Sequence, residues 1–77
     1  MKEFLEFLLS SLVDDPTQIR INEKFKENNT VVYELSVAPE DMGKVIGRRG
    51  RIARAIRVMA KTVASRTDNA RIIVEIV

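Results

Sequence analysis

The 77-residue chain contains no cysteine and no histidine. Without cysteine it can form no disulfide, no thiolate zinc site and no thiol nucleophile, which is typical of proteins from a reducing compartment. Without histidine it lacks the commonest general base and metal ligand, so serine–histidine–aspartate triads are excluded. We therefore expect a protein that is not an enzyme and that holds neither a metal nor a cofactor.

Long apolar runs are also missing. No stretch approaches the roughly 20 residues that a membrane-spanning helix needs, and Glu3 and Glu6 interrupt the N-terminus where a signal peptide would be basic and then apolar. Hydrophobic residues still make up 45% of the chain, enough for a core, although a chain this short has little room for a deep pocket. We expect a soluble, cytoplasmic protein that folds as one domain over residues 1–77 and uses its surface, with no membrane partner.

The small net charge of +2 hides a strong segregation of charge along the chain. Residues 44–66 hold eight of the 13 basic side chains, and all 11 acidic side chains lie elsewhere. A basic run of this kind is often only a solvated helix face. The spacing of its glycines and cations must therefore decide whether the segment binds an anion.

The first half of the chain reads as a helix and a hairpin. Residues 2–13 carry leucines at helical spacing and end at Asp14-Asp15-Pro16, while Phe4 and Phe7 widen the apolar stripe. The wider stripe indicates either a deeply seated helix or a second surface held by a partner. A half-buried strand follows at 18–26, with Ile19, Ile21 and Phe25 on one face.

Residues 27–30 form the expected turn, because asparagine tolerates the left-handed backbone of tight hairpins. The next strand, at 31–37, should therefore pair antiparallel with the first. Its core-facing residues are predicted to be Val31, Tyr33, Leu35 and Val37.

The second half reads as two helices and a strand. Proline and two acids within residues 38–41 begin a short helix that Gly47 ends, and Arg48 and Arg49 form a loop with Gly50. A longer helix follows at 51–65, and a mostly β-branched strand at 71–77. The predicted buried side of the longer helix consists of Ile52, Ile56, Met59 and Val63, supplemented by Ala53, Ala55 and Ala60.

The glycines of this segment do not fit the common nucleotide-binding loops. A Walker-type loop ends in Gly-Lys-Ser/Thr, but Lys44 precedes Val45, and a dinucleotide fingerprint follows a strand, whereas here a helix precedes the loop. What remains is a Gly-x-x-Gly loop between two helices, in which glycine lets the backbone approach a phosphate chain closely. Four cations gather at the start of the second helix, where the helix dipole favours acids: Arg48, Arg49, Arg51 and Arg54. A bound polyanion would explain this arrangement.

The basic residues of the longer helix share one side of a helical wheel, away from the predicted apolar stripe: Arg51, Arg54, Arg57 and Lys61. For Arg57, Lys61 and Arg66 we favour an ordinary solvated helix face. For Arg48, Arg49 and Arg51 we favour contact with an anion.

The run Val45-Ile46-Gly47-Arg48-Arg49-Gly50 closely resembles the signature of the KH domain. The predicted order, helix–strand–strand–helix–helix–strand, resembles the type II form of that domain. Residues 37–47 and the Asp-Asp-Pro after the first helix are similar to the small bacterial single-KH proteins of the KhpA family. The resemblance covers the whole chain and implies an α+β fold, with a three-stranded mixed sheet and three helices packed on one face.

The resemblance also implies a binding site. In KH domains the Gly-x-x-Gly loop clamps the backbone of about four single-stranded nucleotides while the bases lie over a shallow groove. Val45, Ile46 and Ile52 either help to line the groove floor, with a contribution from the strand at 31–37, or belong to the core. The full set of RNA-binding residues that it implies is Lys44, Val45, Ile46, Gly47, Arg48, Arg49, Gly50, Arg51, Ile52 and Arg54.

The basic segment contains no aromatic residue, so stacking of bases on an aromatic platform is not supported there. An aliphatic groove with modest base preference and salt-sensitive affinity fits better. The leading hypothesis is a single-stranded RNA-binding module, an RNA chaperone or post-transcriptional regulator, with single-stranded DNA as an open alternative ligand. The other hypothesis is a scaffold or interaction subunit. The resemblance implies homodimers, pairing with a larger KH-containing RNA-binding protein, and a link to cell-envelope homeostasis and cell length.

Overall fold

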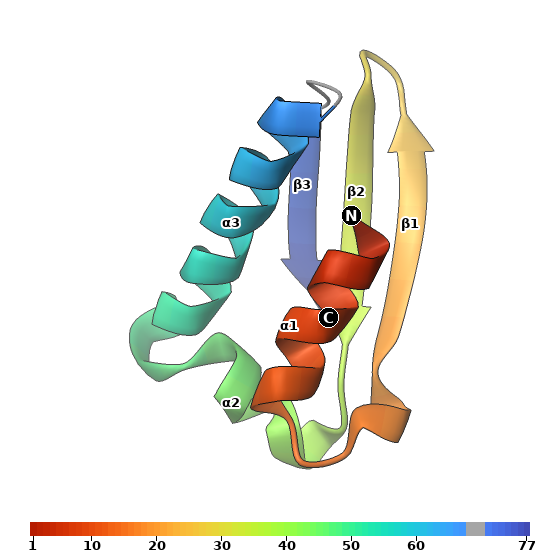
Figure 1. Ribbon diagram of the computed structural model, residues 1–77. Helices are drawn as coiled ribbons and strands as arrows, with labels where there is room; N and C mark the ends of the chain where they lie inside the picture. The colour runs from red at the N-terminus through yellow and green to blue at the C-terminus, as the bar shows by residue number, and fades with distance from the viewer. Residues whose placement is uncertain (68–70) are drawn as a thin grey trace.

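The computed structural model describes residues 1–67 and 71–77 and shows one sheet with helices packed on one of its faces (Figure 1). The helices are α1 (Lys2–Leu12), α2 (Met42–Ile46) and α3 (Arg51–Thr67), and the strands are β1 (Arg20–Lys26), β2 (Thr30–Ser36) and β3 (Arg71–Ile76). The central strand β2 pairs antiparallel with β1 and parallel with β3. The predicted α+β class, element order and three-stranded mixed sheet are confirmed.

The β1–β2 hairpin forms as its turn chemistry predicts. Lys26 pairs with Thr30 at the closed end, and Asn28 and Asn29 between them have φ angles of 61° and 55°. Asparagine occupies this left-handed region more readily than most residues, so the two asparagines fix where the chain reverses. The register that follows places Ile21 opposite Leu35.

The core lies between the inner face of the sheet and the three helices. Leu5 and Leu9 of α1 and Leu35 of β2 are completely buried. Burying one such side chain contributes roughly 1.5–3 kcal/mol, so each of the few large residues of this small core matters for stability. The other members of the core are Tyr33, Val45, Ile56, Ala60, Ala64, Ile72 and Val74.

The buried side of α3 differs from the predicted one. Met59 is 38% exposed and Ala55 is exposed, whereas Ala64, outside the predicted set, is buried. The buried stripe consists mainly of small side chains, which allow α3 to approach β3 closely. It comprises Ala53, Ile56, Ala60 and Ala64. The prediction was wrong for Met59 and Ala55 because periodicity places apolar residues on a helix face without showing how much of that face the sheet covers.

Two phenylalanines are exposed rather than buried. Phe25 is 76% exposed because it lies near the far end of the edge strand β1, whereas Ile19 and Ile21 at the other end pack against the core. Phe7 is 66% exposed. It stands two residues from both Leu5 and Leu9, which places it on the opposite side of α1 from the core. The expectation of a core-facing Phe25 was wrong.

Candidate nucleic-acid interface

The loop between α2 and α3 has a backbone that depends on its glycines. Gly47, which ends α2, has φ 74° and ψ 176°, a combination essentially confined to glycine. Its N–H donates to the Gly43 carbonyl (2.9 Å), and the Gly50 N–H donates back to the Gly47 carbonyl (3.2 Å). Arg49 also adopts a left-handed conformation, with φ 56° and ψ 27°. The loop is therefore a tight, hydrogen-bonded corner that presents two arginines.

Gly47 is also constrained by the packing of its neighbour. A Cβ added there would lie 2.6 Å from Cγ1 of Ile52, far inside van der Waals contact. Gly50 has φ 71°, but a Cβ there would meet nothing within 4 Å. The first glycine is required by both conformation and space, the second by conformation alone.

Four arginines surround this corner with their charges uncompensated. Arg48 and Arg49 on the loop, and Arg51 and Arg54 on the first turns of α3, are all exposed. Within residues 1–67 and 71–77 none of the four forms an ion pair, and the first turn of α3 contains no acid. Because each like charge at the positive end of a helix dipole forgoes about 0.3–1 kcal/mol, this cluster is suited to an external anion.

Lys44 differs from these arginines because its charge is already paired. Its Nζ forms an ion pair with the Asp14 carboxylate and lies 3.6 Å from Oδ1 of Asp41. The hydrogen bond to Asp14 is the main cause that raises the pKa of Lys44 above its ordinary value, and the charge of Asp41 adds to it. The geometry therefore separates Lys44 from the free cations with which the sequence grouped it.

Asp41 is the structural centre of this polar cluster. Its side chain is almost fully buried, and its Oδ2 accepts a hydrogen bond from the Asp15 backbone N–H at 3.1 Å. Burial acts to raise the pKa of Asp41, but hydrogen bonds from the backbones of Asp15 and Asp14 and the charge of Lys44 outweigh it, so that pKa lies below the ordinary value. The carboxylate thus ties the segment after α1 to the start of α2, which leads into the loop. Sequence reasoning gave Asp41 only a helix-dipole role, although its spacing of three from Lys44 was a usable signal.

The three apolar residues left open between groove and core have different positions. Val45 is completely buried and belongs to the core. Ile46 is 38% exposed, and Ile52 is half-buried against the core with its side chain beside Gly47. Ile46 and Ile52 are thus accessible next to the loop, whereas Val45 supports it from below.

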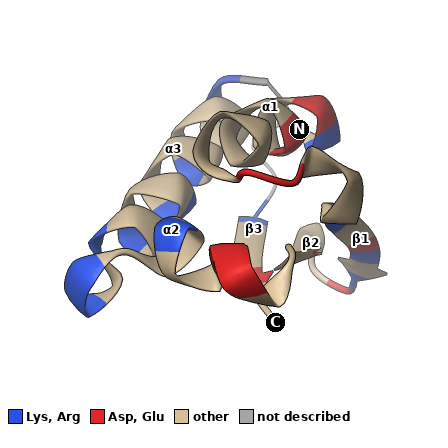
Figure 2. Cartoon of the chain, turned by 90° about the horizontal axis from the view of Figure 1, so that it is seen from below, with Lys and Arg blue, Asp and Glu red and all other residues tan. Residues whose placement is uncertain are grey.

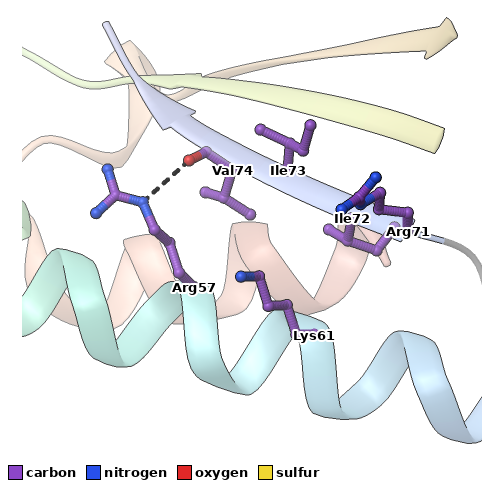
Figure 3. Close-up of a pocket in the computed structure, with 6 residues that line it drawn as sticks. All are labelled: Arg57, Lys61, Arg71, Ile72, Ile73 and Val74. Carbon is purple, nitrogen blue, oxygen red and sulfur yellow. Dashed lines mark hydrogen bonds between the residues drawn. The ribbon is translucent and has the colours of Figure 1, made fainter.

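A groove of about 520 Å³ lies between α3 and β3 (Figure 3). Cations from both elements line it, together with apolar residues of β3: Arg57, Lys61, Arg71, Ile72, Ile73 and Val74. The strand at 31–37, predicted to contribute to an RNA groove, does not line this one, because it is the centre of the sheet and β3 is the strand beside α3. Sequence reasoning treated Arg57 and Lys61 as solvated and omitted Arg71. For Arg57 and Lys61 the sequence did offer a signal, because they continue along α3 the basic face on which Arg54 lies.

Charge is segregated in space as well as in sequence. Figure 2 shows basic residues along α2, the loop and α3, while acids gather at the start of α1, after α1 and just before α2. The described part of the chain contains no helix long and apolar enough to span a bilayer. Among the same residues no cluster of acidic side chains is arranged to hold a metal ion.

The sequence comparisons place these features in a family. The family model described as "KhpA/KhpB, KH domain" matches residues 2–76. The chain belongs to this KH-domain family. The RNA-binding protein KhpA of Clostridium perfringens is 48% identical over 100% of both chains, and that of Oceanobacillus iheyensis is 52% identical over 99% of both. KhpA of Chlamydia pneumoniae is 49% identical over 99% of this chain and 95% of its own.

A solved structure agrees with the fold of this KH domain. The crystal structure of Aquifex aeolicus Era bound to GDP and aluminium fluoride matches 96% of the chain with a TM-score of 0.64 and 21% identity. The match spans only 28% of the Era chain. It supports the architecture of the KH domain and nothing about activity. The curated relatives are named as RNA-binding proteins and not as enzymes.

Proposed function

We propose that this KH domain binds single-stranded RNA and acts as an RNA chaperone or post-transcriptional regulator. The observation that carries the proposal is the corner formed by Gly47–Gly50, which presents Arg48 and Arg49, exposed and without an ion pair among the described residues, at the start of α3. The names of full-length relatives as RNA-binding proteins support it. The loop holds the sugar–phosphate backbone, and the groove beside it receives the bases.

The path of the strand follows from the position of the free cations. Phosphates contact Arg48, Arg49 and the backbone at the start of α3, the end of the helix that favours an anion. Arg51 and Arg54 continue the positive rim toward the groove between α3 and β3. Two of the residues implied by the resemblance then support the site without contacting RNA. Lys44 is paired with Asp14 and Asp41, and Val45 packs in the core beneath the loop.

The same geometry sets the character of binding. The groove is lined by aliphatic residues and cations and by no aromatic ring, so bases are held by apolar contact and hydrogen bonds rather than by stacking. Much of the affinity must come from phosphate contacts and must fall as salt concentration rises. RNA, rather than single-stranded DNA, is the proposed ligand because its 2′-hydroxyl offers a further hydrogen bond beside the phosphates.

The decisive test replaces Arg48 and Arg49 with aspartate and measures binding of short RNA by fluorescence anisotropy at several salt concentrations. Binding should be lost or weakened strongly, and the salt slope should fall by about 0.7 for each lost phosphate contact. The matched control is Lys2→Asp with Lys26→Asp, an equal charge reversal on exposed residues outside the basic segment. Equal affinities for the two double variants, with folds intact by circular dichroism, would contradict the clamp.

The choice between nucleic acids has its own measurement. Unlabelled RNA and DNA of the same sequence compete for the protein against labelled RNA. RNA should displace the probe at the lower concentration. Equal competition would mean that the chain reads the phosphate backbone alone, and a lower concentration for DNA would reverse the assignment.

A second function, as an interaction subunit, is favoured by an apolar surface on α1 and α3. A hollow of about 270 Å³ opens between these helices, lined in part by Leu8, Leu12, Ala55 and Met59. Met59 is 38% exposed, and Val58 beside it is 57% exposed. We propose a second copy of the chain as the occupant, because two linked grooves hold one RNA far more tightly than one small groove does.

Sedimentation velocity tests this pairing. Met59→Asp should convert a dimer to a monomer and weaken RNA binding at protein concentrations where the parent is dimeric. Phe25→Asp, which changes an even more exposed apolar residue on β1, should leave the dimer intact. If the parent protein were monomeric at all concentrations, the homodimer proposal would be refuted. If it formed a complex only with a larger KH-containing protein, the partner would be that protein and not a second copy of the chain.

A further inference from the structure

The backbone pattern of β3 determines which of its polar groups face the groove. The N–H groups of Arg71 and Val77 donate to the carbonyls of Asn29 and Leu35, both at 2.9 Å. Along a strand the N–H and C=O groups of alternate residues point to the same side. Ile72, Val74 and Ile76 therefore direct theirs away from β2. Because β3 is an edge strand, these groups face α3 and the groove between them.

Arg57 closes one of these positions. Its Nε donates to the Val74 carbonyl at 3.1 Å, so the side chain reaches across the groove from α3 to β3 (Figure 3). Guanidinium has five N–H donors and no acceptor. The bond occupies the Val74 carbonyl, which would otherwise be an acceptor in the groove. It uses only Nε of Arg57, so the two terminal nitrogens remain as a planar pair of donors. In Figure 3 these nitrogens point away from the strand and remain available.

The remaining side-chain groups of the groove are also donors. Lys61 and Arg71 contribute an ammonium and a second guanidinium, and the other lining residues are apolar. A base that lies against Val74 thus meets the N–H donors of the Arg57 guanidinium. Without Arg57 it would meet the Val74 carbonyl, which is an acceptor. The groove between α3 and β3 therefore favours ligands that carry hydrogen-bond acceptors.

We propose that Arg57 is a specificity-determining residue that selects a base edge with two adjacent acceptors. Guanine offers such a pair in O6 and N7, and cytosine in O2 and N3, whereas adenine places an amino donor between its acceptors and uracil an N–H. Arginine is suited to such pairs because its fork is planar and bidentate. The inference rests on the proposed RNA-binding function and adds base preference to it.

The experiment uses single-stranded RNA of about eight nucleotides, enough for one domain, with uridine at every place except one. The exceptional base is adenine, cytosine, guanine or uridine, and the uniform uridine background lets the strand slide until that base meets Arg57. The parent protein should bind the guanine and cytosine strands roughly 5- to 100-fold more tightly than the other two, the range expected of a bidentate contact.

Two substitutions separate this role from a simple phosphate contact. Arg57→Ala should abolish the preference and, by releasing the Val74 carbonyl, raise the relative affinity of the adenine strand with its amino donor. Arg57→Lys keeps the charge but loses the fork, so it should retain most of the affinity and lose the preference. Circular dichroism and thermal unfolding confirm that both variants are folded.

Lys61→Ala is the matched control, because it removes a cation one helical turn away without touching the bond to Val74. It should weaken all four strands by the same factor and keep their order. If Arg57→Ala also weakened all four equally, or if the parent bound them equally, base selection by Arg57 would be refuted while RNA binding stood. If the parent bound none of them, the proposed function itself would fail.

Discussion

At the scale of single residues, Gly47 limits what the loop can tolerate. Its backbone angles are those of glycine, and a Cβ would collide with Ile52 at 2.6 Å. We expect Gly47→Ala to lower the free energy of unfolding by about 1–3 kcal/mol, the usual cost of a residue held in a forbidden conformation. Urea denaturation measures the change, and RNA affinity should fall with it because the arginine-bearing corner is displaced.

Gly43 provides the matched comparison for this prediction. It lies in α2, and a Cβ there would meet nothing within 4 Å. Gly43→Ala should therefore raise stability by roughly 0.5–1 kcal/mol, because alanine loses less conformational entropy in a helix than glycine does. A Gly47→Ala protein as stable as Gly43→Ala would show that the loop adopts another backbone in solution.

At the scale of elements, the buried Asp41 carboxylate holds α2 against the segment that follows α1. Because its folded-state pKa lies below its ordinary value of 3.8, ionised Asp41 stabilises the fold at every pH above about 4, and this contribution is lost as pH falls through the folded pKa. We expect Asp41→Asn to lower the melting temperature at pH 7 by roughly 4–8 °C, a shift of the size usual for one lost interaction in a small domain. The gap between parent and variant should narrow steadily below pH 4.

Thermal unfolding followed by circular dichroism from neutral to acidic pH makes this measurement. Glu40→Gln is the control. Glu40 is the exposed neighbour of Asp41, and this substitution removes one negative charge just as Asp41→Asn does. It should follow the parent across the whole range. A difference between parent and Asp41→Asn that stayed constant into acid would mean that the aspartate acts by shape and not by charge.

The same scale explains what sequence could and could not predict. Element order, the asparagine turn and the Gly47–Gly50 corner follow from local chemistry, and the structure confirms all three. The place of Met59, the exposure of Phe25 and the identity of the strand beside α3 depend on how elements far apart in sequence pack together. Periodicity shows which residues share a face, but it does not show which partner covers that face.

The site divides in the same way. The arginines of the loop could be predicted because a glycine-bracketed pair of cations is a local pattern. The groove could not be predicted, because Arg57 and Arg71 become neighbours only when β3 lies along α3. Asp41 shows a third case, in which a local pattern existed but its partner, the Asp15 backbone, lay 26 residues away.

At the scale of the whole molecule, the separation of charge should govern how RNA affinity responds to salt. Figure 2 shows the acidic start of α1 well apart from the basic corner between α2 and α3, in a molecule whose longest extent is 35 Å. Screening lengths are about 30 Å in 10 mM salt and about 8 Å in 150 mM salt. Distant acids therefore oppose RNA binding only when salt is low.

Replacing Glu3 and Glu6 with glutamine tests this dependence, because the change raises the net charge of +2 by two units without touching the basic side. The variant should bind single-stranded RNA more tightly than the parent in about 10 mM salt and equally tightly in about 150 mM salt. The same gain at both concentrations would instead place RNA in direct contact with α1. An unchanged affinity at low salt would show that the local field of the four free arginines alone sets the strength of binding, with no contribution from the rest of the chain.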